Sequence, residues 1–146
     1  MRGPASGGPE LDAALAAVDE LPAADRQELL RASGLVAAGR LDLAQLIVDE
    51  GLQRESENPS WPLLAAQIAY RRNDLTRAES LLRGILVRDP EASESRFNLG
   101  LLLAESGRTA EAAEVLEILV GRGDAPMAAA RATMELTRMR ESAQPD

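Results

Sequence analysis

The chain has 146 residues, a formal net charge of −8 and 45% hydrophobic residues, and it contains neither cysteine nor histidine. This length corresponds to one domain. The lack of cysteine excludes disulfides and cysteine-based metal sites. The negative charge opposes binding to nucleic acid, which is itself negatively charged. One Trp, one Tyr and one Phe leave a core of Leu, Ala, Val and Ile, which suits helices packed on helices.

The N-terminal region divides into two parts. Residues 1–9 (MRGPASGGP) are rich in glycine and proline and predict a flexible lead. Leu11, Leu15 and Val18 follow at spacings of four and three, so residues 10–20 predict a helix within the segment 10–22. We expect this helix to cap the elements that follow. A plug in a groove and a dimerisation element are the alternatives.

Three segments of 34 residues, 25–58, 59–92 and 93–126, repeat one pattern. The eighth, fifteenth, twentieth and twenty-fourth places hold Ala32, Ala66 and Gly100; Gly39, Asn73 and Gly107; Ala44, Ala78 and Ala112; and Val48, Leu82 and Leu116. A fixed period of this size is typical of repeat architectures. The small residues allow two helices to cross closely, and the Gly or Asn between them supplies the left-handed residue that ends the first helix.

Each segment therefore predicts a pair of helices joined by a short turn. The expected ranges are 25–38 and 41–54, 59–72 and 75–88, and 93–106 and 109–122. Asn58 is the expected N-cap of the second pair, with Pro59 at its first helical place. Asp74, Ser93 and Thr109 are the expected caps of the later helices.

A last helix is expected over 125–141, opened by Pro126. Its Met127, Ala130 and Met134 share one face, and we expect this face to pack on the preceding helices as a terminal cap. Residues 142–146 are polar and predict a tail.

The pattern resembles the tetratricopeptide repeat, a helix–turn–helix of 34 residues. The third segment carries the resemblance most fully, in Phe97-Asn98-Leu99-Gly100, Gly107-Arg108, Ala112 and Leu116. The first segment departs from the family pattern at Arg31 and Gly51, and Trp61 stands one place before the family's tryptophan. The resemblance implies an all-α solenoid of three repeats within 23–126, flanked by the N-terminal helix and a C-terminal capping helix.

The resemblance also implies a concave groove lined by the first helix of each repeat. The candidate partner-binding residues are Leu29, Ser33, Val36, Leu63, Leu64, Gln67, Tyr70, Arg71, Phe97, Asn98, Leu101 and Glu105. The expected apolar strip among them consists of Leu29, Val36, Leu63, Tyr70, Phe97 and Leu101, and exposure of such residues together marks an interaction surface. Family members that clamp a terminal carboxylate use Lys, Arg and Asn at groove places. Only Asn98 fits that set here, and Glu94 opposes it.

These residues predict a non-catalytic protein–protein interaction module, an adaptor or scaffold that binds a peptide or helix through the groove. Two alternatives stay open. One is a bacterial secretion-type chaperone that holds an apolar client segment. The other is a structural subunit that self-assembles through its repeats or its N-terminal helix, and a homodimer belongs to this reading.

An enzyme is not expected, and neither is a cofactor or a metal. Without His and Cys, the remaining acid pairs are Asp19-Glu20 and Asp49-Glu50, whose neighbouring side chains point about 100° apart on a helix. The sequence has no glycine-rich phosphate loop and no calcium-loop spacing. It also has no signal-peptide pattern and no apolar run long enough to insert in a membrane, so a cytoplasmic location is expected.

Overall fold

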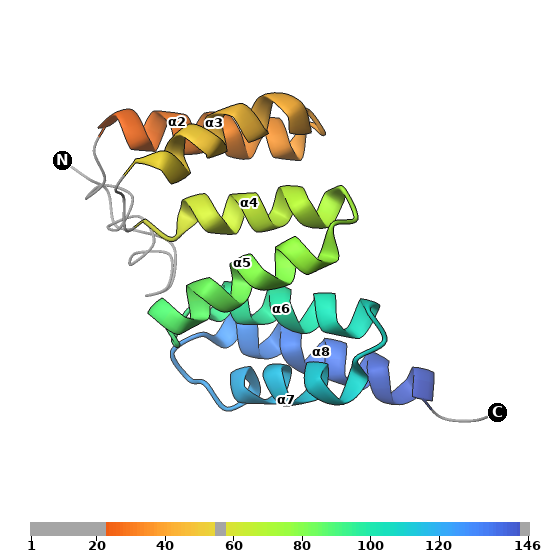
Figure 1. Cartoon of the computed structure of the whole chain (residues 1–146). Coiled ribbons are helices and arrows are strands. Elements are labelled where there is room, and N and C mark those ends of the chain that lie inside the picture. Colours follow the sequence, from red (N-terminus) through yellow and green to blue (C-terminus); the bar gives the residue numbers. More distant parts are fainter. Residues whose placement is uncertain (1–22, 55–57, 144–146) are drawn as a thin grey trace.

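The computed structural model describes residues 23–54 and 58–143, and over these residues it is all-helical (Figure 1). The helices are α2 (Ala23–Ala37), α3 (Leu41–Gln53), α4 (Ser60–Arg71), α5 (Leu75–Arg88), α6 (Ser93–Glu105), α7 (Thr109–Val120) and α8 (Pro126–Ala143). Every helix end predicted within this part of the chain lies within two residues of the observed end. The predicted helix 10–20 lies outside the described residues.

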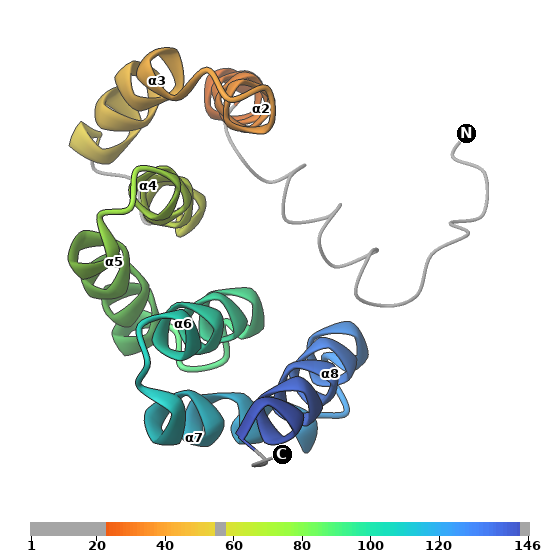
Figure 2. The same cartoon turned by 90° about the vertical axis from the view of Figure 1, so that its right-hand side faces the viewer.

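The helices stack as three antiparallel pairs in a curved arrangement. Figure 2 shows α2, α4 and α6 on the inner side of the curve and α3, α5 and α7 on the outer side, with α8 beside α6 and α7. Each pair closes at its small residues: Ala44, Ala78 and Ala112 have no exposed surface. In the third pair, a Cβ atom added to Gly100 would lie 2.4 Å from Leu116 Cδ2, so only glycine allows this approach.

The three turns within the pairs share one geometry. Gly39, Asn73 and Gly107 have φ angles of 78°, 62° and 80°, so the predicted left-handed residue is confirmed in each pair. The amide that follows each of them donates back to the preceding helix, as in Arg108 N to Leu103 O at 2.9 Å. This hydrogen bond is the six-to-one bond of a Schellman motif, and it stops the first helix at the same place in every repeat.

Two of the expected caps are confirmed and two are wrong. Asp74 accepts from Arg77 N at 3.3 Å, and Asn58 Oδ1 accepts from Ser60 N at 3.0 Å, although α4 begins one residue later than expected. Ser93 and Thr109 are instead the first helical residues, and neither preceding residue makes a side-chain cap. In the 34-residue register the cap of each second helix falls one place before Thr109, where Arg108 stands.

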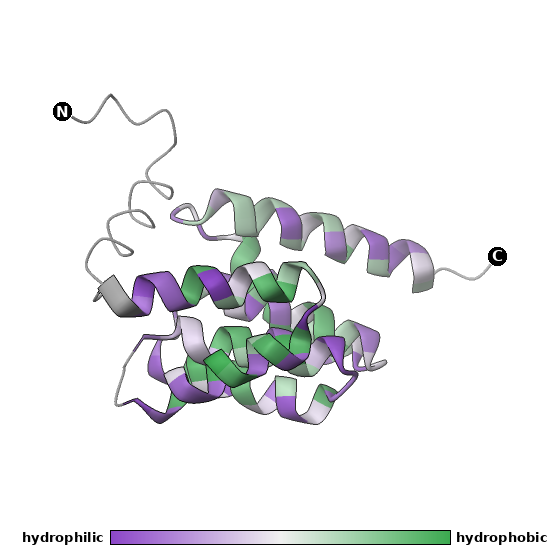
Figure 3. Ribbon diagram, turned by 90° about the horizontal axis from the view of Figure 1, so that it is seen from above, coloured by the Kyte–Doolittle hydropathy of each residue, from purple (hydrophilic) through white to green (hydrophobic). Residues whose placement is uncertain are grey.

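The predicted packing face of α8 is wrong. Met127 and Met134 are 67% and 73% exposed, whereas Ala132, Leu136 and Met139 are buried against the stack. Both sets follow helical spacing, and the set built on the small Ala132 allows α8 the closer approach. Figure 3 shows hydrophobic and hydrophilic residues alternating along α8, the helix that ends near the C-terminal mark.

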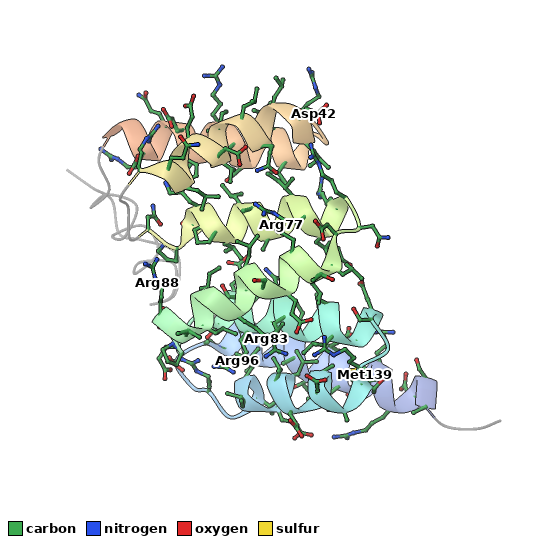
Figure 4. The ribbon with its side chains drawn as sticks, in the orientation of Figure 1. Asp42, Arg77, Arg83, Arg88, Arg96 and Met139 are labelled. Atoms are coloured by element: carbon green, nitrogen blue, oxygen red, sulfur yellow. The ribbon has the colours of Figure 1, made fainter. Side chains whose placement is uncertain are left out.

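Arginine side chains tie neighbouring pairs together. Arg72 pairs with Asp42 at 2.7 Å, which joins the second pair to the first, and Arg108 pairs with Glu79 at 2.5 Å, which joins the third to the second. In Figure 4, Arg77, Arg83 and Arg88 are spread along α5 and form no single basic patch. Over the described residues, no helix has the length and hydropathy of a membrane span.

Candidate partner-binding groove

Two hollows adjoin on the inner face and form one groove. The first has a volume of about 390 Å³ and is lined from α2, α4, α5 and α6 by Ser33, Val36, Ala37, Ala66, Gln67, Tyr70, Arg71, Ala78, Leu82, Asn98, Leu101 and Leu102. The second, of about 300 Å³, is lined by Arg26, Leu29, Leu30, Ser33, Ser60, Leu63, Leu64, Gln67 and Glu94. Because Ser33 and Gln67 line both, the two hollows are continuous. We call this surface the inner groove.

Most of the predicted binding residues line the inner groove. They are Leu29, Ser33, Val36, Leu63, Leu64, Gln67, Tyr70, Arg71, Asn98 and Leu101. Phe97 and Glu105 do not. A larger hollow, of about 720 Å³, lies between the start of α4 and the end of α5, and it contains none of the predicted residues.

The expected apolar strip is only partly exposed. Leu29, Val36 and Phe97 are 9%, 6% and 5% exposed, so the expectation that they face a ligand is wrong. They fill the space between successive inner helices instead. Arg131 of α8 also lies over the Phe97 ring, with its guanidinium carbon 4.0 Å from the ring centroid, a cation–π contact.

The apolar surface left in the groove comes from other side chains. Leu63 and Leu101 are half-buried, and Tyr70 is 38% exposed. Leu30, which was not among the predicted binding residues, is 71% exposed and lines the second hollow. Its neighbour Leu29 enters the core, and the 100° turn between successive helical residues then leaves Leu30 at the groove wall. That difference in orientation could have been read from the helical spacing.

Two amide side chains stand between these apolar residues. Gln67 and Asn98 are half-buried, and neither has a side-chain hydrogen bond to another residue in the described part of the chain. Each offers two donors and an acceptor. A peptide backbone carries both a donor and an acceptor at each residue, so these amides can satisfy an extended segment lying along the groove.

Arg71, Tyr70 and Glu105 make contacts within the fold at one end of the groove. Arg71 Nη1 donates to the carbonyl oxygen of Val36 at 2.5 Å, which fastens α4 to the end of α2. The Tyr70 hydroxyl donates to the Glu105 carboxylate of α6. This hydrogen bond, together with partial burial, raises the pKa of Tyr70 to about 12. Tyr70 is therefore a neutral donor at physiological pH, and the pair bridges α4 and α6.

Over the described residues, no three His, Cys, Asp or Glu side chains gather in a way that could hold a metal ion. What the inner groove offers is a partly apolar surface with hydrogen-bonding groups. This composition suits recognition of a polypeptide segment.

Comparison with protein families agrees with this geometry. A family model described as tetratricopeptide repeat matches residues 29–92 and again residues 63–128. The two overlapping matches include the three helix pairs almost entirely, and together they extend over more than half of the chain. Repeats of this family generally mediate protein–protein interaction, typically as non-catalytic modules. A search of curated proteins found no match.

Proposed function

The chain belongs to the tetratricopeptide repeat family, and we propose that it is an adaptor whose inner groove binds an apolar segment of a partner protein. The observation that carries the proposal is the continuity of the two hollows across α2, α4 and α6. A continuous groove can hold several consecutive residues of a ligand, whereas an isolated hollow holds one side chain.

Leu30, Leu63 and Leu101 supply the apolar contacts in this proposal. Complete burial of a leucine side chain contributes about 1.5–3 kcal/mol, and the ordering of a peptide offsets part of that gain. Three partly exposed leucines therefore support an affinity on the order of micromolar. Gln67 and Asn98 would hydrogen-bond the backbone of the bound segment and fix its position along the groove.

The test is a selection of binding peptides from a random display library, using the whole wild-type chain as bait. The selected peptides are then measured by calorimetry against Leu63→Glu/Leu101→Glu and against Val87→Glu. Val87 lies on α5 and is 82% exposed, so its variant adds a carboxylate far from the groove. We expect the groove variant to lose at least about tenfold in affinity, or ~1.4 kcal/mol, and the Val87 variant to bind like wild type.

Circular dichroism of the variants separates loss of binding from loss of fold. If the folded groove variant binds the selected peptides as tightly as wild type does, the inner groove is not the binding site and the proposal is wrong.

A further inference from the structure

The face of α8 that points away from the stack is apolar and exposed. Met127 and Met134 are 67% and 73% exposed, and Ala130 between them is exposed as well. At 3.6 residues per turn these residues share one face, about 180° around the helix from the buried Ala132 and Leu136. A terminal repeat helix usually turns a polar face to water, so two exposed methionines here indicate a contact surface.

The polar side chains beside this face have partners within α8. Thr133 Oγ1 donates to Ala129 O and Thr137 Oγ1 donates to Thr133 O, both at 2.9 Å. Glu135 and Arg138 form an ion pair with each other. Covering the face would therefore leave no threonine hydroxyl without an acceptor, and the usual cost of burying a polar group is small.

We propose that this face pairs with the same face of a second copy of the chain, with the two α8 helices antiparallel about a two-fold axis near Ala130. Met127 precedes Ala130 by three residues, and Met134 follows it by four. An antiparallel pair with this centre sets Met127 of each copy beside Met134 of the other. The small Ala130 residues meet at the crossing, as small residues do in the helix pairs of the repeats. The stripe is thus self-complementary, as an isologous interface requires.

Charge favours a second copy at this place. The whole chain carries a net charge of −8, but α8 contains three arginines and two glutamates and is close to neutral. Two copies that meet through α8 avoid the like-charge repulsion that strongly acidic surfaces would bring together. One helix pair buries less than the roughly 800 Å² per partner of a standard interface, so the dimer dissociates on dilution.

The pairing goes beyond the proposed peptide binding and does not depend on it. None of the described residues that line the inner groove belongs to α8. Both grooves therefore stay open in the dimer, which can hold two segments of one partner and gain avidity.

Cysteine cross-linking tests the geometry, because the natural chain has no cysteine. Ala130→Cys is expected to form a disulfide-linked dimer on mild oxidation, whereas Val87→Cys on α5 forms far less. A mixture of Met127→Cys and Met134→Cys chains should form the mixed dimer faster than either homodimer. Seven residues along a helix separate like positions by about 10 Å in an antiparallel pair.

Sedimentation equilibrium of the complete chain tests the association itself. The wild type is expected to shift from monomer to dimer with rising concentration, and Val87→Arg should behave in the same way. Met134→Arg is expected to weaken the dimer at least about tenfold without loss of helicity. A wild type that stays monomeric at about 1 mM, or a Met134→Arg chain that dimerises like wild type, overturns the proposal. Faster formation of the Met127→Cys homodimer than of the mixed dimer overturns the antiparallel arrangement.

Discussion

The indole ring of Trp61 lies directly over Gly51, across the interface between the first and second repeats. Trp61 is 1% exposed, and a Cβ atom added to Gly51 would lie 2.2 Å from Trp61 Cδ2 and 2.5 Å from Cε2. Each residue alone departs from the family pattern, but together they fill one space. In the 34-residue register the same two places of the next interface hold Ile85 and Ser95, with the large and small residues exchanged.

We predict that Gly51→Ala destabilises the fold by about 1–3 kcal/mol, because the added methyl group overlaps a buried ring that cannot move away. The matched control is Gly84→Ala in α5, where an added Cβ meets no atom within 4 Å. This control should stabilise the protein by about 0.5–1 kcal/mol through helix propensity. Urea unfolding of both variants measures the difference. Equal stability of Gly51→Ala and wild type would show that the ring does not occupy this place in solution.

A second prediction concerns the left-handed turns. Gly107→Ala should cost about 1–2 kcal/mol, because its φ of 80° is unfavourable for a residue with a Cβ atom. Gly121 ends α7 with a φ of −84° and open space around it, so Gly121→Ala should change the free energy of unfolding little. The pair is measured by chemical denaturation. A Gly121→Ala loss as large as that of Gly107→Ala would contradict the explanation from backbone conformation.

Tyr70 provides a prediction at alkaline pH, and as the only tyrosine it can be titrated by its own absorbance. Its pKa is raised to about 12 by the hydrogen bond to Glu105 and then by burial. Since the folded pKa exceeds the ordinary value, the stabilisation is complete below about pH 10 and is lost as the pH rises toward 12. Glu105→Ala should move the titration to lower pH. Glu94→Ala on the same helix serves as the control, and an equal shift in both variants would remove Glu105 as the cause.

Glu79 provides the corresponding prediction in acid. Hydrogen bonds from Arg108 and then Arg83 lower the pKa of its carboxyl below the ordinary value. The associated stabilisation is therefore complete above the unfolded pKa of about 4.3 and is lost as the pH falls through the folded pKa. Carboxyl titration by NMR should show a raised Glu79 pKa in Arg108→Gln and a smaller rise in Arg83→Gln. The reverse order would assign the main contact to Arg83.

The sequence predicts the repeat well because the period of 34 residues constrains several places together. Gly39, Asn73 and Gly107 mark the turns, and the alanines at the crossings mark the pairs. These features depend on contacts within one repeat, which recur in the same register and can therefore be recognised from spacing alone.

The errors lie where contacts with other elements decide the outcome. Met134 and Leu136 both belong to stripes with helical spacing, and only packing on α6 and α7 determines which stripe is buried. Val36 and Phe97 were expected at the groove surface, but they fill the space between successive inner helices. Trp61 and Gly51 could have been read as a compensating pair, since both are exceptions to the pattern and both lie at the same interface.

The most direct measurement of the central claim is NMR mapping of one selected peptide on the isotope-labelled whole chain, without prior choice of peptides by the groove variants. The account predicts that the largest shift changes fall on Leu30, Gln67, Asn98 and Leu101, along the inner faces of α2, α4 and α6. Largest changes on α3, α5 and α7, with the inner groove unperturbed, would contradict it.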